Sequence, residues 1–155
     1  MAGRSNWQAF WAHHNAQHPS ANVSPTHKDT NVYYHFRAPR LALGLFLNDN
    51  VEGKKGIGTY LRGFKREDKT VSRPRLAQHQ QSLMGVLTQA AALNNDAPPR
   101  KHDDTYGDYS VFHEIDIDDP QNWAQMSKWF EDMRQVYIGV LGSPSPPQGS
   151  GLKQK

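Results

Sequence analysis

The stretch His-Glu-Ile-Asp-Ile-Asp-Asp-Pro-Gln-Asn-Trp, residues 113–123, joins the pattern of a β-strand to the signals that begin a helix. Residues 109–117 are rich in aromatic and β-branched side chains and predict a strand. Asp118 or Asp119 can then cap a helix whose first turn contains Pro120. The last predicted helix follows, and its large apolar residues recur at steps of three or four: Trp123, Met126, Phe130, Met133, Tyr137, Val140 and Leu141.

Five further elements are expected upstream of that stretch. A first helix begins near Ser5 and carries an aromatic stripe, while Val32–Phe36 and Leu41–Leu47 predict two strands of an antiparallel hairpin. The stretch 56–69 has apolar residues at helical spacing and is interpreted as a short helix, followed by a longer helix over 74–94. The order predicts an α+β fold, with a small antiparallel sheet of about three strands packed against three to four helices.

The chain has 155 residues, which is enough for one domain with its own core. We expect that domain to span 1–142 and the Pro/Gly/Ser-rich tail, 143–155, to be disordered. There is no cysteine, which excludes disulfides, thiolate metal ligands and a cysteine nucleophile. The sequence shows neither a signal-peptide pattern nor an apolar run of transmembrane length, so we expect a cytoplasmic protein without membrane contact.

Charge is segregated along the chain. Residues 54–75 hold eight basic side chains against two acidic ones, whereas residues 103–132 hold nine acids against Lys128. The two regions can complement each other within the molecule or face water, or the basic segment can bind an anionic partner. Basic side chains neutralise phosphates, and exposed aromatic rings stack on unpaired bases. The candidate nucleic-acid-binding residues are Lys54, Lys55, Tyr60, Arg62, Lys65, Arg66, Lys69, Arg73 and Arg75.

Two carboxylates in the strand suggest an alternative chemistry. Glu114 and Asp116 would lie on one face, about 7 Å apart from the strand rise, and such a pair can hold Mg²⁺ for phosphodiester cleavage. Restriction-type nucleases also place a lysine two residues after the second acid. No Lys or Arg lies between Thr105 and Lys128, which favours a structural role for these carboxylates. We therefore assign no catalytic residue and no cofactor, and Mg²⁺ enters under the nuclease alternative alone.

A histidine pair near the N-terminus has the spacing of two metal ligands on one face of a helix. His14 and His18 lie four residues apart on the predicted first helix. A structural or catalytic zinc needs at least a third protein ligand, and the sequence pattern supplies none. His14 also falls in the aromatic stripe, so we expect it to be buried in the core and assign no metal site.

Three motifs together resemble a known domain family. They are Trp7-x-x-Phe10-Trp11, the apolar strand Leu41–Leu47, and a closing Asp-Ile-Asp-Asp-x-x-x-Trp-x5-Trp-Phe over 116–130. They are similar to a bacterial and archaeal domain of unknown function that is often fused C-terminal to restriction-endonuclease-like nuclease domains. The resemblance would cover about residues 5–141. Its motifs are structural and define no catalytic residue, so it implies a module that binds rather than cuts.

These observations lead to one leading hypothesis and two alternatives. The leading one is a non-catalytic binding or regulatory protein in restriction, phage defence or counter-defence. It would contact nucleic acid, or a nucleic-acid-processing protein, through the basic segment. The alternatives are a metal-dependent nuclease that uses Glu114 and Asp116, and a protein-interaction inhibitor that acts through an acidic face over 103–119.

Overall fold

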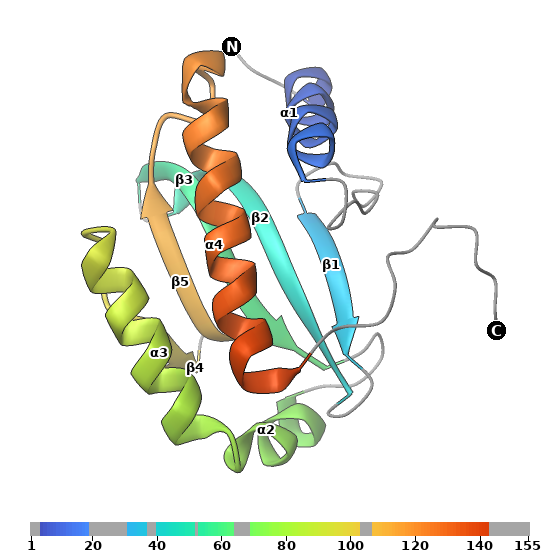
Figure 1. The fold of residues 1–155 in the computed structure, drawn as a ribbon, viewed down its shortest axis with the longest axis vertical. Coiled ribbons are helices and arrows are strands. Elements are labelled where there is room, and N and C mark those ends of the chain that lie inside the picture. Colours follow the sequence, from blue (N-terminus) through green and yellow to red (C-terminus); the bar gives the residue numbers. More distant parts are fainter. Residues whose placement is uncertain are drawn as a thin grey trace, which may run out of the picture.

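The computed structural model describes residues 4–18, 31–36, 40–51, 53–63, 69–102 and 107–142. Within them the chain forms an α+β fold, in which a five-stranded antiparallel sheet of order β1-β2-β3-β5-β4 packs with four α-helices (Figure 1). The elements are α1 (Arg4–Gln17), β1 (Asn31–Phe36), β2 (Leu41–Val51), β3 (Lys54–Arg62), α2 (Lys69–Ala77), α3 (Gln80–Leu93), β4 (Arg100–His102), β5 (Asp108–Glu114), a 3₁₀ turn η2 (Pro120–Asn122) and α4 (Trp123–Leu141).

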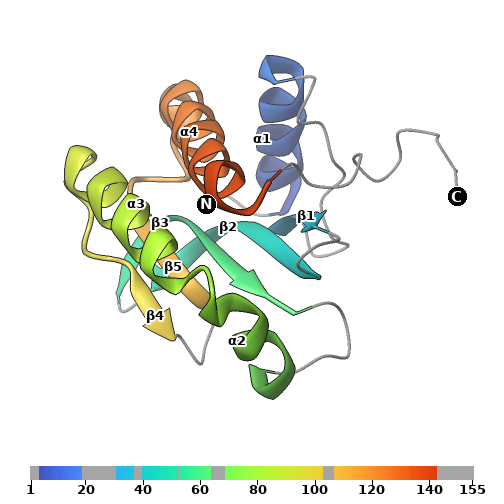
Figure 2. The same ribbon diagram turned by 60° about the horizontal axis from the view of Figure 1, so that its bottom comes forward.

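Helices α1, α3 and α4 lie over one face of the sheet, and α2 lies toward one end of it (Figure 2). The core is the layer between this face and the helices. Alternate residues of β2, from Leu41 to Leu47, point into it and are fully buried. The aromatic side chains of α1 and α4 complete the layer, with Trp11 and Phe130 rings 5.4 Å apart between centroids. No helix among the described residues is long and apolar enough to cross a membrane.

The elements with the strongest local patterns are confirmed. Helix α1 includes the predicted aromatic stripe, and β1 and β2 form the predicted antiparallel hairpin, in which Phe36 pairs with Leu41. Asp119 caps the 3₁₀ turn η2, because its Oδ1 accepts from the backbone N–H of Gln121 at 2.9 Å, and α4 follows this turn from Trp123. Helix α4 ends at Leu141, and its C-cap is Gly142, whose φ of 89° suits glycine. The predicted tail, 143–155, lies outside the described residues.

The prediction of a short helix over 56–69 is wrong, because Lys54–Arg62 is strand β3 at the centre of the sheet. Ile57, Thr59 and Leu61 point to the helices and are fully buried. A polar threonine on the core face hid the strand alternation from sequence reading. On the other face, Gly44 of β2 leaves room for the ring of Tyr60, which would lie 2.6 Å from a Cβ at that position.

The predicted helix over 74–94 is two helices, so its start was placed wrongly. Helix α2 already begins at Lys69 and contains Pro74 in its interior. The proline ring cannot donate to the helix ladder, and α2 ends three residues later. Helix α3 then runs to Leu93, with Asn94 as its C-cap, which confirms the predicted end.

The region after α3 also departs from the prediction. Arg100–His102, expected to be loop, is the edge strand β4, and it is too short and polar to show a strand pattern. Strand β5 ends at Glu114, three residues before the predicted end. The carboxylate of Asp116 instead accepts from the backbone N–H of Asp118 at 3.0 Å, which forms a turn. The sheet therefore has five strands where about three were expected.

Candidate functional site: the basic end of the sheet

Strand β3 divides the predicted basic segment between opposite ends of the sheet. Lys54 and Lys55 begin the strand and Arg62 ends it, eight residues further on. An extended strand advances about 3.4 Å per residue, so the two ends are about 27 Å apart. The nine candidate residues therefore do not form one continuous patch.

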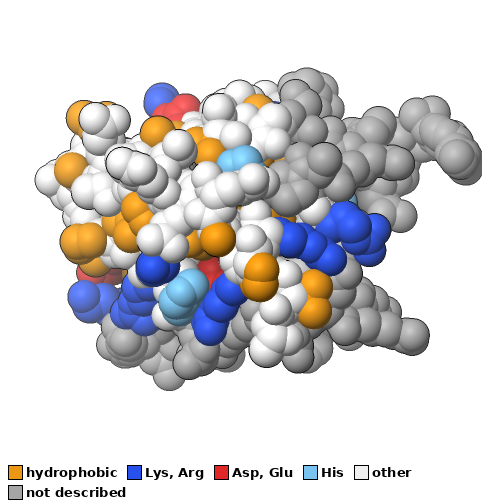
Figure 3. Space-filling view, turned by 90° about the horizontal axis from the view of Figure 1, so that it is seen from below, with side chains coloured by type: hydrophobic (Ala, Val, Ile, Leu, Met, Phe, Trp, Pro, Cys, Tyr) orange, Lys and Arg blue, Asp and Glu red, His pale blue; other side chains and the backbone are white. Residues whose placement is uncertain are grey.

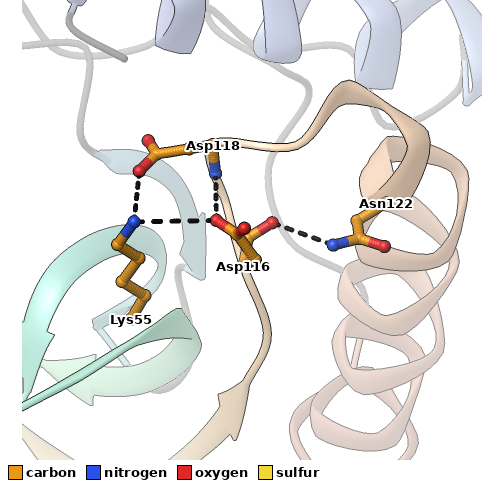
Figure 4. Close-up of polar contacts among 4 residues, drawn as sticks. All are labelled: Lys55, Asp116, Asp118 and Asn122. Carbon is orange, nitrogen blue, oxygen red and sulfur yellow. Dashed lines mark hydrogen bonds and ion pairs between the residues drawn. The ribbon is translucent and has the colours of Figure 1, made fainter. Parts of the chain in front are cut away.

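The two lysines at the start of β3 contact carboxylates at the end of β5 and in the turn that follows it. Lys55 Nζ lies 2.6 Å from Asp118 Oδ2 and 3.8 Å from Asp116 Oδ1 (Figure 4). Lys54 Nζ lies 3.8 Å from Glu114 Oε1. These side chains are between 27% and 64% exposed, so each pair contributes at most about 1 kcal/mol. At this end, the segregated charges of the sequence complement each other within the molecule.

The carboxylates of the predicted metal pair have separate contacts. Asp116 lies in the turn beyond β5, where its carbonyl oxygen accepts from Asn122 Nδ2 at 3.0 Å (Figure 4). Glu114 is the last residue of β5 and contacts a different lysine. The expectation that both side chains lie on one strand face was wrong, because Asp116 lies outside the strand. Among the described residues, no group of three or more His, Asp or Glu side chains is arranged to hold a metal ion.

Arginines from separate segments meet at the other end of the sheet. Arg40 precedes β2, Arg62 ends β3, and Arg75 of α2 donates from Nη1 to the carbonyl oxygen of Arg40 at 2.9 Å. Figure 3 looks onto this end and shows Lys and Arg side chains gathered across it. We call this group the basic end, and its members are Arg40, Arg62, Arg73, Arg75, Arg100 and Lys101.

A buried carboxylate lies within the basic end. Asp108 begins β5 and its side chain is 2% exposed. Arg73 of α2 donates to it from both Nε and Nη2, each at 3.1 Å, in a bidentate pair. The Nδ1 atom of His102, on the neighbouring strand β4, lies 3.4 Å from Asp108 Oδ1. Three polar contacts thus compensate a carboxylate that burial would otherwise destabilise.

A β-bulge sets the direction of Asp108. Thr59 of β3 pairs with Val111 of β5, whereas Leu61 pairs with Asp108, so β5 has one residue more in this interval. Opposed residues of a sheet point to the same face, and Leu61 faces the helices. The extra residue therefore turns Asp108 toward the face on which Arg73 lies. Tyr109 accommodates the bulge with a φ of 52°, a strained conformation for a bulky side chain.

Arg62 interacts with the side chains of Tyr33 and His35. The Arg62 guanidinium lies 5.6 Å from the centroid of the Tyr33 ring. The pKa of His35 is lowered, first by burial and then by the charge of Arg62. Tyr60, a candidate for base stacking, packs against Phe46 and is 4% exposed, so this conformation presents little of its ring to a ligand.

The sequence identified half of this site. Arg62 and Arg73 were candidates, as was Arg75; Lys65 and Arg66 lie outside the described residues. Lys69 begins α2, and its side chain is outside the described part. The sequence missed four contributors because each lies away from the basic run, in or beside a strand that its own charge does not mark as part of a site. These are Arg40, Arg100, Lys101 and Asp108.

The acidic stretch does not form one face among the described residues. Asp108 is buried at the basic end, whereas Glu114 is the last residue at the other end of β5 and Asp116 follows it. Asp103 and Asp104 lie outside the described residues. The described acids of 103–119 are therefore divided, as the basic residues are.

Two histidines form side-chain contacts inside the fold. The prediction that His14 is core is confirmed, since its Nδ1 lies 2.6 Å from Ser127 Oγ and burial lowers its pKa to about 4. His113 Nδ1 lies 2.6 Å from Asp96 Oδ1, and Trp129 Nε1 donates to Asp96 Oδ2 at 3.0 Å. This network joins the end of α3, β5 and α4, and no sequence pattern indicated it.

Comparisons with protein-family models, curated proteins and solved structures give no match to this chain. The resemblance to a domain fused to nucleases therefore stays a prediction that rests on the three sequence motifs. The fold and the basic end carry the functional argument.

Proposed function

We propose that this protein binds nucleic acid through the basic end of its sheet. The observation that carries the proposal is that Arg40, which precedes β2, and the arginines of β3, α2 and β4 lie at one end of the sheet. The sequence of the three stretches involved, 35–40, 62–75 and 100–108, contains ten Lys and Arg residues against five carboxylates. That excess favours an anionic partner even when every acid of these stretches is counted.

Arginine is well suited to phosphate. Its planar guanidinium offers five donors in a fork that matches a phosphate group, and its charge persists at every physiological pH. Nucleic acid presents phosphates in a regular row, and neutralising them releases condensed counterions. A surface with several arginines should therefore bind nucleic acid with an affinity that depends strongly on the salt concentration.

Salt-dependent binding tests the proposal. Labelled single- and double-stranded DNA and RNA of mixed sequence would be titrated with the protein between about 50 and 200 mM salt. We expect the logarithm of the association constant to fall linearly with the logarithm of the salt concentration, with a slope of about −0.9 per neutralised phosphate on duplex DNA. Binding that is absent at the lowest salt would overturn the proposal and favour a protein partner.

A matched pair of variants locates the contact. Arg40→Gln with Arg75→Gln removes two charges from the basic end, and Lys54→Gln with Lys55→Gln removes two from the opposite end. We expect the first variant to lose up to about two units of salt slope and the second to retain the wild-type slope. Equal losses in both would show that net charge, and not the basic end, drives binding.

The nuclease alternative gains one observation. The lysine that the sequence lacked near Glu114 is supplied in space, because Lys54 of the neighbouring strand lies 3.8 Å from its carboxylate. Incubation of plasmid DNA with the protein and Mg²⁺ or Mn²⁺ tests it against Glu114→Ala. Cleavage by the wild type alone would support a nuclease, whereas equal results from both proteins would reject Glu114 as a catalytic residue.

The biological setting that we propose is restriction, phage defence or counter-defence. Its support is the resemblance of the N-terminal aromatic motif and of 116–130 to a domain fused to nucleases. Comparing binding to host genomic DNA with binding to phage DNA, methylated and unmethylated, tests this setting. A preference for one of these substrates would support it, and identical affinities would count against it.

A further inference from the structure

The Asp108–Arg73 pair is asymmetric in its exposure. The carboxylate of Asp108 is 2% exposed, while the Arg73 side chain is 33% exposed. The negative member therefore lies beneath the surface and the positive member reaches it. A pair of this kind presents positive charge to solvent, although its formal charges cancel.

The pair also fixes the arginine. Two hydrogen bonds from Nε and Nη2 hold the plane of the Arg73 guanidinium against Asp108. A free arginine loses much side-chain entropy when it binds a ligand, and an arginine already held in one orientation loses less. The chain builds this arrangement at a cost, since it needs a buried carboxylate and the positive φ of Tyr109.

Further groups of the basic end lie on the same helix as Arg73 and on the strand beside β5. Arg75, two residues along α2, bonds to the backbone at Arg40. His102 contacts the same carboxylate from the edge strand β4. Arg73 is thus held in a part of the basic end to which α2, β4 and β5 all contribute.

We propose that Asp108 is a positioning residue that holds Arg73 as a specific seat for one phosphate group of the bound nucleic acid. This inference rests on the proposed function and deepens it, because it separates one oriented contact from the diffuse attraction of the basic end. Arg73 contacts the phosphate, and Asp108 acts through Arg73.

The substitution Asp108→Asn distinguishes the two kinds of attraction by the sign of its effect. It removes a negative charge from a site that binds an anion, so diffuse electrostatics predicts equal or tighter binding. Loss of the carboxylate also releases the guanidinium, so the positioning role predicts weaker binding, by about tenfold. The measurement is the dissociation constant for the same labelled oligonucleotides at one salt concentration.

A second comparison keeps the charge constant. Arg73→Lys retains the positive charge but removes the bidentate fork, and Arg75→Lys makes the same change two residues away. We expect Arg73→Lys to weaken binding about tenfold and Arg75→Lys to change it less than about twofold. Thermal unfolding shows whether each variant is folded. If Asp108→Asn does not fold, the comparison of Arg73→Lys with Arg75→Lys tests whether the orientation of Arg73 matters for binding.

The outcomes separate the inference from the proposed function. Salt-dependent binding by the wild type, with tighter binding by Asp108→Asn and equal effects of the two lysine variants, would overturn the inference alone. Absence of salt-dependent binding by the wild type would overturn both. Weaker binding by folded Asp108→Asn and Arg73→Lys supports the phosphate seat.

Discussion

The hydroxyl oxygens of Thr59 and Tyr137 lie 2.8 Å apart in the core between β3 and α4. Tyr137 donates its own hydroxyl hydrogen to the carbonyl oxygen of Tyr109 at 2.6 Å, so Thr59 is the donor to Tyr137. The central strand is therefore joined through one side chain to the last helix and to the bulge beside Asp108. Burial raises the pKa of Tyr137, which keeps its hydroxyl protonated as a donor.

Removing either hydroxyl should destabilise the fold to a different extent. Thr59→Val deprives Tyr137 of one donor, and we expect a loss of about 1–2 kcal/mol. Tyr137→Phe leaves both Thr59 and the Tyr109 carbonyl without this partner, and we expect about 2–3 kcal/mol. Urea unfolding measures both, and Thr59→Ser, which keeps the hydroxyl, is the control. A Tyr137→Phe variant as stable as wild type would contradict this account.

The stability of the fold should decrease in mild acid because of His14. Burial, then the charge of His18, lowers the folded-state pKa of His14 from 6.5 to about 4; Glu131 opposes the shift, whereas His13 and Arg134 add to it. The unfolded chain therefore binds a proton near pH 6.5 that the folded chain accepts only near pH 4. Stability falls as the pH decreases through this interval, by an amount on the order of 3 kcal/mol.

The measurement is the free energy of unfolding in urea at several pH values from 7 to 4. His14→Gln is the comparison, because glutamine can still bond to Ser127 and does not titrate. Carboxylates titrate in both proteins, so the difference between the two curves reports His14. Parallel curves between about pH 6.5 and 4 would refute the assignment.

The carboxylate of Asp96 should contribute more to the stability of the fold than its position after a helix suggests. Asp96→Ala leaves His113 Nδ1 and Trp129 Nε1 without their acceptor in a largely buried site, and we expect a loss of about 3 kcal/mol. The control is Asp132→Ala, whose partner Lys128 is exposed, with an expected change within about 0.5 kcal/mol. Similar losses in the two variants would argue against the network.

Two glycines should respond in opposite directions to alanine. A Cβ on Gly44 would lie 2.6 Å from the Tyr60 ring, so we expect Gly44→Ala to cost about 1–3 kcal/mol. Gly85, within α3, has nothing within 4 Å of such a Cβ, so Gly85→Ala should stabilise the fold by about 0.5–1 kcal/mol. Thermal unfolding compares them, and a stabilised Gly44→Ala would show that the Tyr60 ring moves aside at little cost.

Local sequence patterns predicted those elements that are encoded within a few neighbouring residues. The continuous apolar run of β2, the periodic apolar face of α4 and the Asp119 cap are each encoded in a single short stretch. The sequence likewise predicted that His14 is buried, because it belongs to an aromatic stripe. These features follow from the geometry of one helix or one strand, which a sequence displays directly.

The tertiary structure decided what depends on partners distant in sequence. Thr59 is a core residue only because Tyr137, 78 residues later, supplies its hydrogen bond, and this hid β3 from sequence reading. The basic run was divided because an extended strand separates its ends. Asp108 and Arg73 are 35 residues apart, and a bulge brings them together. Charge in the sequence predicted an anionic partner, but only the packing of α2 against the sheet defined the surface that we propose for it.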